Sequence, residues 1–365
     1  MNNFLQILTR CNRVVMISPV LLSALGLFGL MSIATGQGTF PSREVFIQSA
    51  ALAAGLALAA VVLILGYRYL IDLEKYLYPA GILLLLSVYI PGLGISSYGS
   101  RSWISMGLLT FQPSELAKLI FILVLSSYLA RKKDQLSSRS GILKVGLYAL
   151  PYILIVAKED LGSGCVFCII WIFMIFCAGL ELNRIVKFFL LLLAHLPLAY
   201  FALAGYQKTR IDAFLHPADL SLPGNYQVWN AKVAIGSGGL LGKGYLHGTQ
   251  SALGFLPVPE SDFMYATIVE ESGFLGGALI ILLFAFFLYH ALHTAKYAAD
   301  LQGTLLAAGI SGMFFFQAFE NIAMNMGIMP VTGITLPFVS YGGSSMLVSM
   351  ISCGLLLSVS AQRKL

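Results

Sequence analysis

The sequence predicts an all-α polytopic membrane protein, and three observations support this class. Hydrophobic residues make up 58% and charged residues only 10% of the 365 positions, whereas soluble domains have roughly 45–50% apolar and about 25% charged residues. Apolar runs long enough to cross about 30 Å of hydrocarbon recur along the whole chain. Lysine and arginine gather in alternate connecting segments. This pattern leaves no room for a separate soluble domain.

Ten membrane-spanning helices are predicted, and no linker divides them, so residues 1–365 are expected to form a single integral membrane domain. The spans cover residues 14–34, 45–66, 76–91, 114–130, 143–157, 164–180, 187–206, 262–289, 301–325 and 339–360. The first span is not followed by a small-residue cleavage site, so we expect it to be retained in the membrane.

The positive charges predict the orientation of these spans. With the N-terminus inside, the inner segments hold fourteen lysines and arginines and the outer segments hold seven. The inner loop 131–139, RKKDQLSSR, contributes most to this difference. Because short cytoplasmic loops are enriched in lysine and arginine, both termini are expected in the cytoplasm. The long loop between spans seven and eight, residues 207–261, is then external. The net charge of +6 reflects this topology and gives no reason to invoke a nucleic acid.

The segment before the tenth span predicts a break in helical structure. Residues 330–345 read PVTGITLPFVSYGGSS, with two prolines, three glycines and five serines or threonines. Proline removes a backbone donor, and glycine loosens what remains of a helix. Non-helical backbone at membrane depth persists only where protein or a water-filled cavity satisfies it. We therefore expect a broken or re-entrant segment here, lining a polar cavity.

Ionisable residues beside or inside the spans are the first candidates for a site, because they are costly in lipid. Glu115 and Lys118 are i, i+3 neighbours at the start of the fourth span, and Arg101 precedes them. They form either a self-neutralising ion pair or the wall of a groove for a charged ligand. Asp160 either caps the sixth span or belongs to the site. Glu320 lies in the ninth span, below the predicted break.

Asp262 stands where the external loop becomes the eighth span. A carboxylate at a helix start is commonly only a cap. Asp262 is nevertheless the carboxylate with the best access to the external interface, where a general base acting on a lipid headgroup must lie.

The external loop adds two cations, Arg210 and Lys243, the second within the glycine run 236–244. This run is a near miss to a nucleotide-binding P-loop, because Gly244 stands where serine or threonine is required. Its predicted external position also removes it from ATP, so nucleotide hydrolysis is rejected. The run either binds a phosphate through its amides and Lys243 or is a flexible turn.

Six motifs carry a resemblance to a known family. They are QPSELAK at 112–118, DLGSG at 160–164, YQKTRIDAFLHP at 206–217, AIGSGGLLGKG at 234–244, FLPVPESDF at 255–263 and NIAMNMGIMPVTGITLPFVSYGGSS at 321–345. By these residues the chain resembles, from end to end, the SEDS family of shape, elongation, division and sporulation proteins. Within it, the chain looks most like the RodA branch, with FtsW as the close relative.

The resemblance implies a peptidoglycan glycosyltransferase that polymerises lipid II at the outer face of the bacterial cytoplasmic membrane. It implies ten helices, a large external loop between spans seven and eight, and a class B penicillin-binding protein as partner. The family's essential aspartate falls on Asp262. The chain departs from the usual family motif at Val258, Glu260 and Ser261, and it has Thr335 where proline is usual.

The resulting hypothesis is an inverting transfer between two lipid-linked sugars, lipid II and the growing glycan on its polyprenyl diphosphate. Asp262 would accept the proton of the attacking 4-hydroxyl. Arg101, Lys118, Arg210 and Lys243 would stabilise the leaving diphosphate, with Glu115 holding Lys118. No residue is assigned to a metal, although a divalent cation is compatible with such a leaving group. Two alternatives stay open: a lipid II flippase, and a non-catalytic scaffold for a penicillin-binding protein.

Overall fold

The computed structural model describes residues 8–97, 100–107 and 109–362, and most of these residues are helical. The helices are α2 (Arg13–Gly36), α3 (Arg43–Leu65), α4 (Tyr67–Asp72), α5 (Glu74–Leu86), α6 (Pro113–Lys132), α7 (Arg139–Glu159), α8 (Leu161–Cys177), α9 (Leu182–Ala202), α10 (Gly205–Leu215), α11 (Asn225–Ser237), α12 (Thr249–Ala252), α13 (Met264–Lys296), α14 (Leu301–Asn325) and α15 (Gly343–Ala361). Each of the ten predicted spans coincides with one helix: α2, α3, α5 to α9 and α13 to α15.

Seven helices within the described residues are long and apolar enough to cross a membrane: α2, α3, α6, α7, α13, α14 and α15. The apolar helix α8 is shorter, with 17 residues. The class predicted from composition, a multi-spanning helical membrane protein, is therefore confirmed.

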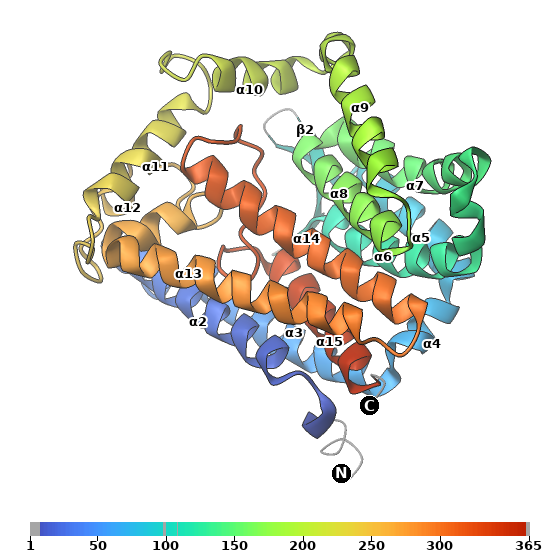
Figure 1. The fold of residues 1–365 in the computed structure, drawn as a ribbon. Coiled ribbons are helices and arrows are strands. Elements are labelled where there is room, and N and C mark those ends of the chain that lie inside the picture. Colours follow the sequence, from blue (N-terminus) through green and yellow to red (C-terminus); the bar gives the residue numbers. More distant parts are fainter. Residues whose placement is uncertain (1–7, 98–99, 108, 363–365) are drawn as a thin grey trace.

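Close helix packing in the bundle depends on small residues. Helix α15 runs along α3, and a Cβ built on Gly354 would lie only 2.7 Å from the Ala59 Cα. Small residues at such crossings let helix backbones approach in a membrane, where no hydrophobic effect drives helices together. Helices α2, α13 and α14 continue the same bundle side by side (Figure 1).

The segments predicted to be cytoplasmic meet at one end of the bundle. An ion pair of 2.8 Å joins Arg68 at the start of α4 to Asp300 before α14. The backbone amide of Asn12 donates to Ser360 Oγ at 3.1 Å, so the start of α2 lies beside the end of α15 (Figure 1). The first and last helices thus begin and end on the same side.

The segments predicted to be external meet at the other end. Gln37, after α2, donates to the Ser251 carbonyl at 3.4 Å, and the Tyr341 amide donates to the Glu260 carbonyl at 2.8 Å. These contacts join the 36–43 turn, the 203–263 segment and the break before α15. The two sets of connecting segments, which alternate along the sequence, therefore lie at opposite ends of the fold.

A small sheet between α5 and α6 is a departure from the all-α prediction. Strands β1 (Gly94–Ser97), β2 (Ser100–Met106) and β3 (Leu109–Phe111) form an antiparallel sheet in the order β1-β2-β3. Ile95 pairs with Trp103 across β1 and β2, and aromatic–β-branched pairs favour strands. The predicted third span was also too long, because α5 ends at Leu86. Strands this short lack the periodicity that would have shown them in the sequence.

The 207–261 loop, which the sequence predicts to be external, is a folded layer, named the external layer after that prediction. It contains α11, α12 and all but the first two residues of α10. These helices arch over the upper left of the molecule (Figure 1). Their small core consists of Ala231, Ala234, Leu256, Phe263, Ala266 and Met324. Because Met324 belongs to α14 and Ala266 to α13, this layer is packed directly onto the bundle.

The segment between α14 and α15 is non-helical, as its prolines and glycines predicted. Gln48 of α3 holds its end, because its Nε2 donates to the Ser340 carbonyl at 2.9 Å and its Oε1 accepts from the Gly342 amide at 3.1 Å. Phe338, with φ of +66°, is buried in the core. The backbone polar groups of the break are thus satisfied by neighbouring helices.

The packing at Gly354 predicts a stability difference between two glycine variants. Gly354→Ala places a methyl group against the Ala59 backbone and should destabilise the protein by about 1–3 kcal/mol. Gly146→Ala is the matched control, because its nearest neighbour is a Trp171 ring atom 3.9 Å from the added Cβ. Thermal unfolding in detergent should show a lower Tm for Gly354→Ala only. Equal Tm values for the two variants would contradict the close approach of α3 and α15.

Candidate active site

Asp262 lies at the end of the external layer, two residues before α13 begins. Its main-chain carbonyl accepts hydrogen bonds from Asn321 Nδ2 at 3.0 Å and Asn325 Nδ2 at 2.9 Å. Its carboxylate Oδ1 accepts a hydrogen bond from Ser261 Oγ at 2.8 Å. The capping explanation is wrong, because Phe263 is the N-cap of α13 and no side chain caps this helix. The half-buried carboxylate is therefore available for chemistry.

The break before α15 passes directly in front of this carboxylate. Gly333 has a φ of +80°, and a Cβ built on it would lie 3.8 Å from Asp262 Oδ2. Asn321 Nδ2 donates a second hydrogen bond, at 2.8 Å, to the Ile334 carbonyl. One amide of α14 therefore holds both the aspartate and the facing segment. Hydrogen bonds from two asparagines of α14 thus position the site.

Thr332 joins two more of the predicted residues. Its carbonyl accepts a hydrogen bond from Arg210 Nη1 at 3.0 Å, and its hydroxyl donates to Glu320 Oε1. Glu320 is fully buried, and its Oε2 has no hydrogen-bond partner among the described residues. Sequence reasoning missed Thr332; its position next to a glycine in the break was the only available signal.

Asp160 completes the group. It caps α8, which was one of its two predicted roles. Its carboxylate accepts hydrogen bonds from the Gly162 amide at 3.0 Å and from Ser163 Oγ at 2.6 Å. It also lies beside the break, because a Cβ built on Gly162 would be 2.8 Å from Thr332 Cβ and 3.3 Å from Asp160 Oδ1. The structure thus gathers Asp160, Arg210, Asp262 and Glu320 around residues 332–333.

The electrostatics of this group favour a base. Burial raises the pKa of Asp262, a hydrogen bond from Ser261 and the charge of Arg210 lower it, and the Asp160 carboxylate raises it. The resulting pKa lies above the ordinary value for aspartate. Because proton affinity rises with pKa, Asp262 is a stronger proton acceptor than an exposed aspartate.

Arg101 lies on the other side of Asp160. It is half-buried on β2 and lines a small groove with Pro113, Ser114, Glu159 and Asp160. Its backbone amide donates to Glu159 Oε2 at 2.9 Å. Glu159 was not predicted, and its only signal was its place next to Asp160.

Glu115 and Lys118 form the self-neutralising pair that was one of their two interpretations. Lys118 Nζ lies 2.7 Å from Glu115 Oε1, and Lys118 is only 1% exposed. Their part in binding a substrate stays a prediction.

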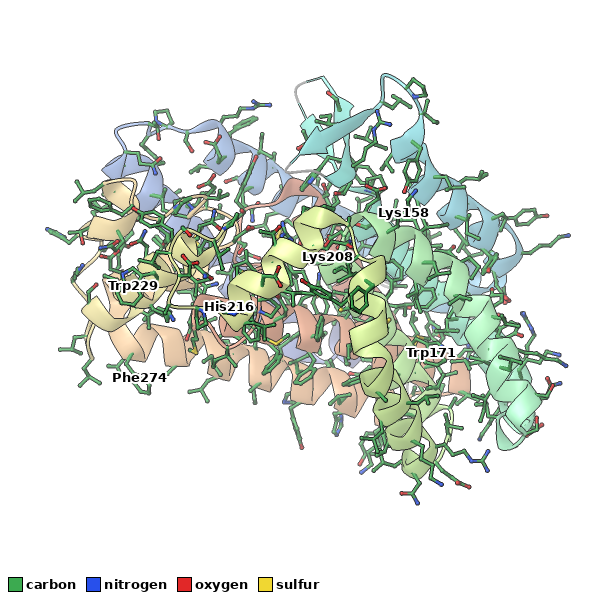
Figure 2. The ribbon with its side chains drawn as sticks, turned by 90° about the horizontal axis from the view of Figure 1, so that it is seen from above. Lys158, Trp171, Lys208, His216, Trp229 and Phe274 are labelled. Carbon is green, nitrogen blue, oxygen red and sulfur yellow. The ribbon has the colours of Figure 1, made fainter. Side chains whose placement is uncertain are left out.

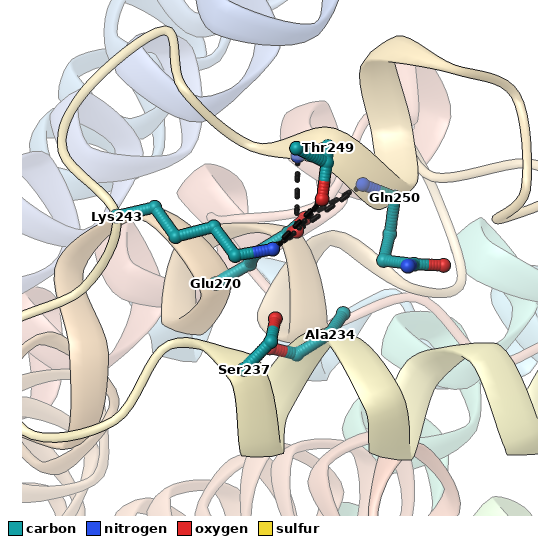
Figure 3. Close-up of polar contacts among 6 residues, drawn as sticks. All are labelled: Ala234, Ser237, Lys243, Thr249, Gln250 and Glu270. Atoms are coloured by element: carbon teal, nitrogen blue, oxygen red, sulfur yellow. Dashed lines mark hydrogen bonds and ion pairs between the residues drawn. The ribbon is translucent and has the colours of Figure 1, made fainter.

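The structure places Lys243 in a different cluster, with Glu270 of α13. Glu270 is fully buried, and its Oε1 accepts from Lys243 Nζ at 2.5 Å, from the Thr249 amide at 2.9 Å and from the Gln250 amide at 3.2 Å (Figure 3). The ammonium group is therefore engaged inside the protein. A role for Lys243 at a diphosphate would compete with this ion pair.

The glycine run 236–244 is docked on a break in α13. Gly273 has a φ of +68°, outside the helical region. Beside it, the Lys243 amide donates to the Glu270 carbonyl at 3.0 Å, and the Phe274 amide donates to the Gly239 carbonyl at 2.8 Å. These bonds replace helical hydrogen bonds missing at the break, so the run is bound to α13 through its backbone. Glycine is needed where the two backbones touch.

Within the described residues, no group of three or more histidines, cysteines, aspartates or glutamates is placed to hold a metal ion. The carboxylates of Asp160, Asp262 and Glu320 surround residues 332–333 but do not form such a set.

Comparisons with known proteins identify the family of this chain. The family described as "Cell cycle protein", which comprises FtsW, RodA and SpoVE, matches residues 12–365. The chain is 35% identical over 315 residues to the peptidoglycan glycosyltransferase MrdB of Escherichia coli (strain K12), covering 86% of this chain and 85% of that protein. It is 37% identical over 325 residues to the stage V sporulation protein E of Bacillus subtilis (strain 168), covering 88% of each.

A solved structure resembles the whole fold. A chain of a structure titled "Structural coordination of polymerization and crosslinking by a peptidoglycan synthase complex" superposes with a TM-score of 0.81. It is 29% identical to this chain, and the match covers 96% of this chain and 97% of that one. The chain belongs to the FtsW/RodA/SpoVE family.

The Lys243–Glu270 cluster predicts a stability effect separate from activity. Lys243→Met leaves the buried Glu270 carboxylate without its cation, although the Thr249 and Gln250 amides still donate to it. The change should therefore destabilise the protein by about 1–3 kcal/mol. Lys144→Met is the control, because Lys144 is exposed on α7. A lower Tm is expected for Lys243→Met alone. An unchanged Tm would mean that the ion pair does not hold the glycine run.

Proposed function

We propose that this protein is a peptidoglycan glycosyltransferase that polymerises lipid II into glycan strands at the outer face of the bacterial cytoplasmic membrane. The observation that carries the proposal is Asp262, a carboxylate that caps no helix and faces the break beside Arg210. The glycosyltransferase name of the related MrdB supports the same activity.

The topology proposed with it has ten spans, cytoplasmic termini and an external 207–261 layer. The excess of lysine and arginine in alternate segments supports this orientation. The site lies at the end opposite the termini, and in this orientation it meets the outer leaflet. A class B penicillin-binding protein is the proposed partner, in line with the synthase complex that the fold resembles.

The proposed reaction is an inverting transfer. Asp262 accepts the proton of the acceptor's 4-hydroxyl as its oxygen bonds to the anomeric carbon of the donor. The bond from that carbon to the diphosphate breaks, and the electron pair leaves with the diphosphate. Arg210 is the cation best placed to stabilise the developing charge, because it already reaches Thr332 in front of Asp262. Arg101 approaches the same region from the Asp160 side.

Removing the base predicts loss of polymerisation without loss of fold. Asp262→Asn keeps the size of the side chain and should lower the polymerisation rate by about 10²–10⁴-fold. Asp219→Asn, in an exposed turn of the same layer, is the matched control and should retain activity. The measurement is gel analysis of labelled lipid II with purified protein, with and without the penicillin-binding protein.

Full activity of Asp262→Asn would remove Asp262 as the base. Movement of lipid II across liposomes by a wild-type protein that makes no polymer would favour a flippase, and neither activity would favour a scaffold.

The raised pKa of Asp262 predicts the pH dependence. The base works when deprotonated, so kcat/KM should fall as the pH drops through a pKa above the ordinary value of about 3.9. Arg210→Gln removes a charge that lowers this pKa and should move the acidic limb to higher pH. Asp160→Asn removes a charge that raises it and should move the limb to lower pH. Shifts of both variants in one direction would contradict the assignment.

A further inference from the structure

The external layer contains a groove that no step of the proposed reaction uses. It lies between α10, α11 and residues 327–331, and its wall includes Arg210, Phe214, Val228, Trp229, Lys232 and Val331. We propose that this α10–α11 groove binds the saccharide chain of the growing glycan, with Trp229 as the stacking surface. The inference rests on the proposed function and extends it to the path of the product.

The groove lies outside the membrane-spanning part of the protein. Its lining residues come from α10, from α11 and from the segments next to them, and from residues that follow the last residue of α14. None of them belongs to any of the ten spans of the proposed topology. Its ligand is therefore exposed to water, which suits a sugar chain and excludes a polyprenyl tail.

The groove leads directly from the catalytic group. Arg210 lines it and also donates to the Thr332 carbonyl at 3.0 Å. Val331, in its floor, precedes the two residues that face Asp262 and Glu320. The groove therefore adjoins the catalytic group through Arg210 and Val331.

The Trp229 side chain is exposed enough to contact a ligand. Helix α11 packs on the bundle through Asn230, Ala231 and Ala234, and Asn230 Nδ2 donates to the Phe255 carbonyl at 2.7 Å. Trp229 points away from this packing, remains 51% exposed and lies far from Trp171 when the molecule is seen from above (Figure 2). An indole in water offers a flat apolar face on which the C–H face of a sugar ring packs.

The charges of the groove define the ligand further. Its lining contributes two cations, Arg210 and Lys232, and no carboxylate. Gly327, with φ of +73°, makes room for Lys232, because a Cβ there would lie 3.2 Å from the ammonium nitrogen. A saccharide that carries carboxylates matches this combination of an aromatic surface and two positive charges.

Fluorescence of Trp229 tests the proposal independently of catalysis. The full-length protein with Trp103→Phe and Trp171→Phe retains Trp229 as its single tryptophan. The probe is a soluble tetrasaccharide of alternating N-acetylglucosamine and N-acetylmuramic acid. A saturable change in emission is expected, about tenfold weaker in affinity after Lys232→Ala. Tyr226→Ala should leave the affinity unchanged, because Tyr226 is exposed on α11 outside the groove.

Three outcomes would contradict saccharide binding in the α10–α11 groove. They are no emission change with the tetrasaccharide, an equal loss of affinity in Tyr226→Ala, or quenching of Trp229 by brominated lipids in nanodiscs, which would place α11 in the bilayer. Asp262→Asn should still bind the tetrasaccharide although it should not polymerise lipid II. Loss of saccharide binding and loss of polymerisation can therefore be told apart. In polymerisation, Trp229→Ala should shorten the strands and Trp229→Phe should restore them, with an unchanged Tm in both variants.

Discussion

The site depends on the need to satisfy backbone polar groups that leave regular helix near a membrane. Two asparagines of α14 meet this need, because Asn321 bonds the carbonyls of Asp262 and Ile334 while Asn325 bonds the Asp262 carbonyl again. An unsatisfied backbone group in such a place costs several kcal/mol. The same bonds that pay this cost also fix the distance between the base and the segment facing it.

The external layer is held to the bundle by a second set of backbone contacts. The glycine run pairs with the break at Gly273, and the buried Glu270 gathers Lys243 and the amides of Thr249 and Gln250. Arg210 is placed at the other end of this layer, where it bonds the Thr332 carbonyl. A layer anchored at both ends brings the Arg210 side chain to Thr332, in front of the proposed base Asp262.

Much of the candidate group was visible in the sequence. Asp160, Arg210, Asp262 and Glu320 stand out because a charge next to an apolar span is costly and rare. Lys243 was predicted from its place in the glycine run, yet it belongs to an internal ion pair, since the sequence does not show which carboxylate lies nearest. Thr332, Glu159 and the three-stranded sheet gave almost no signal, because a neutral side chain, an acidic neighbour and strands of three to seven residues have no distinctive pattern.

By itself, the sequence determined the membrane class, the places of the long apolar helices and the position of the break, because these follow from local hydropathy, charge and backbone chemistry. Only the tertiary structure decided the partners of the charged residues. It separated Asp262 from a capping role, paired Lys243 with Glu270, and brought Thr332 between Arg210 and Glu320. The physical reason is that ion pairs and hydrogen bonds act over about 3 Å between segments far apart in the chain. Such distances are set by packing.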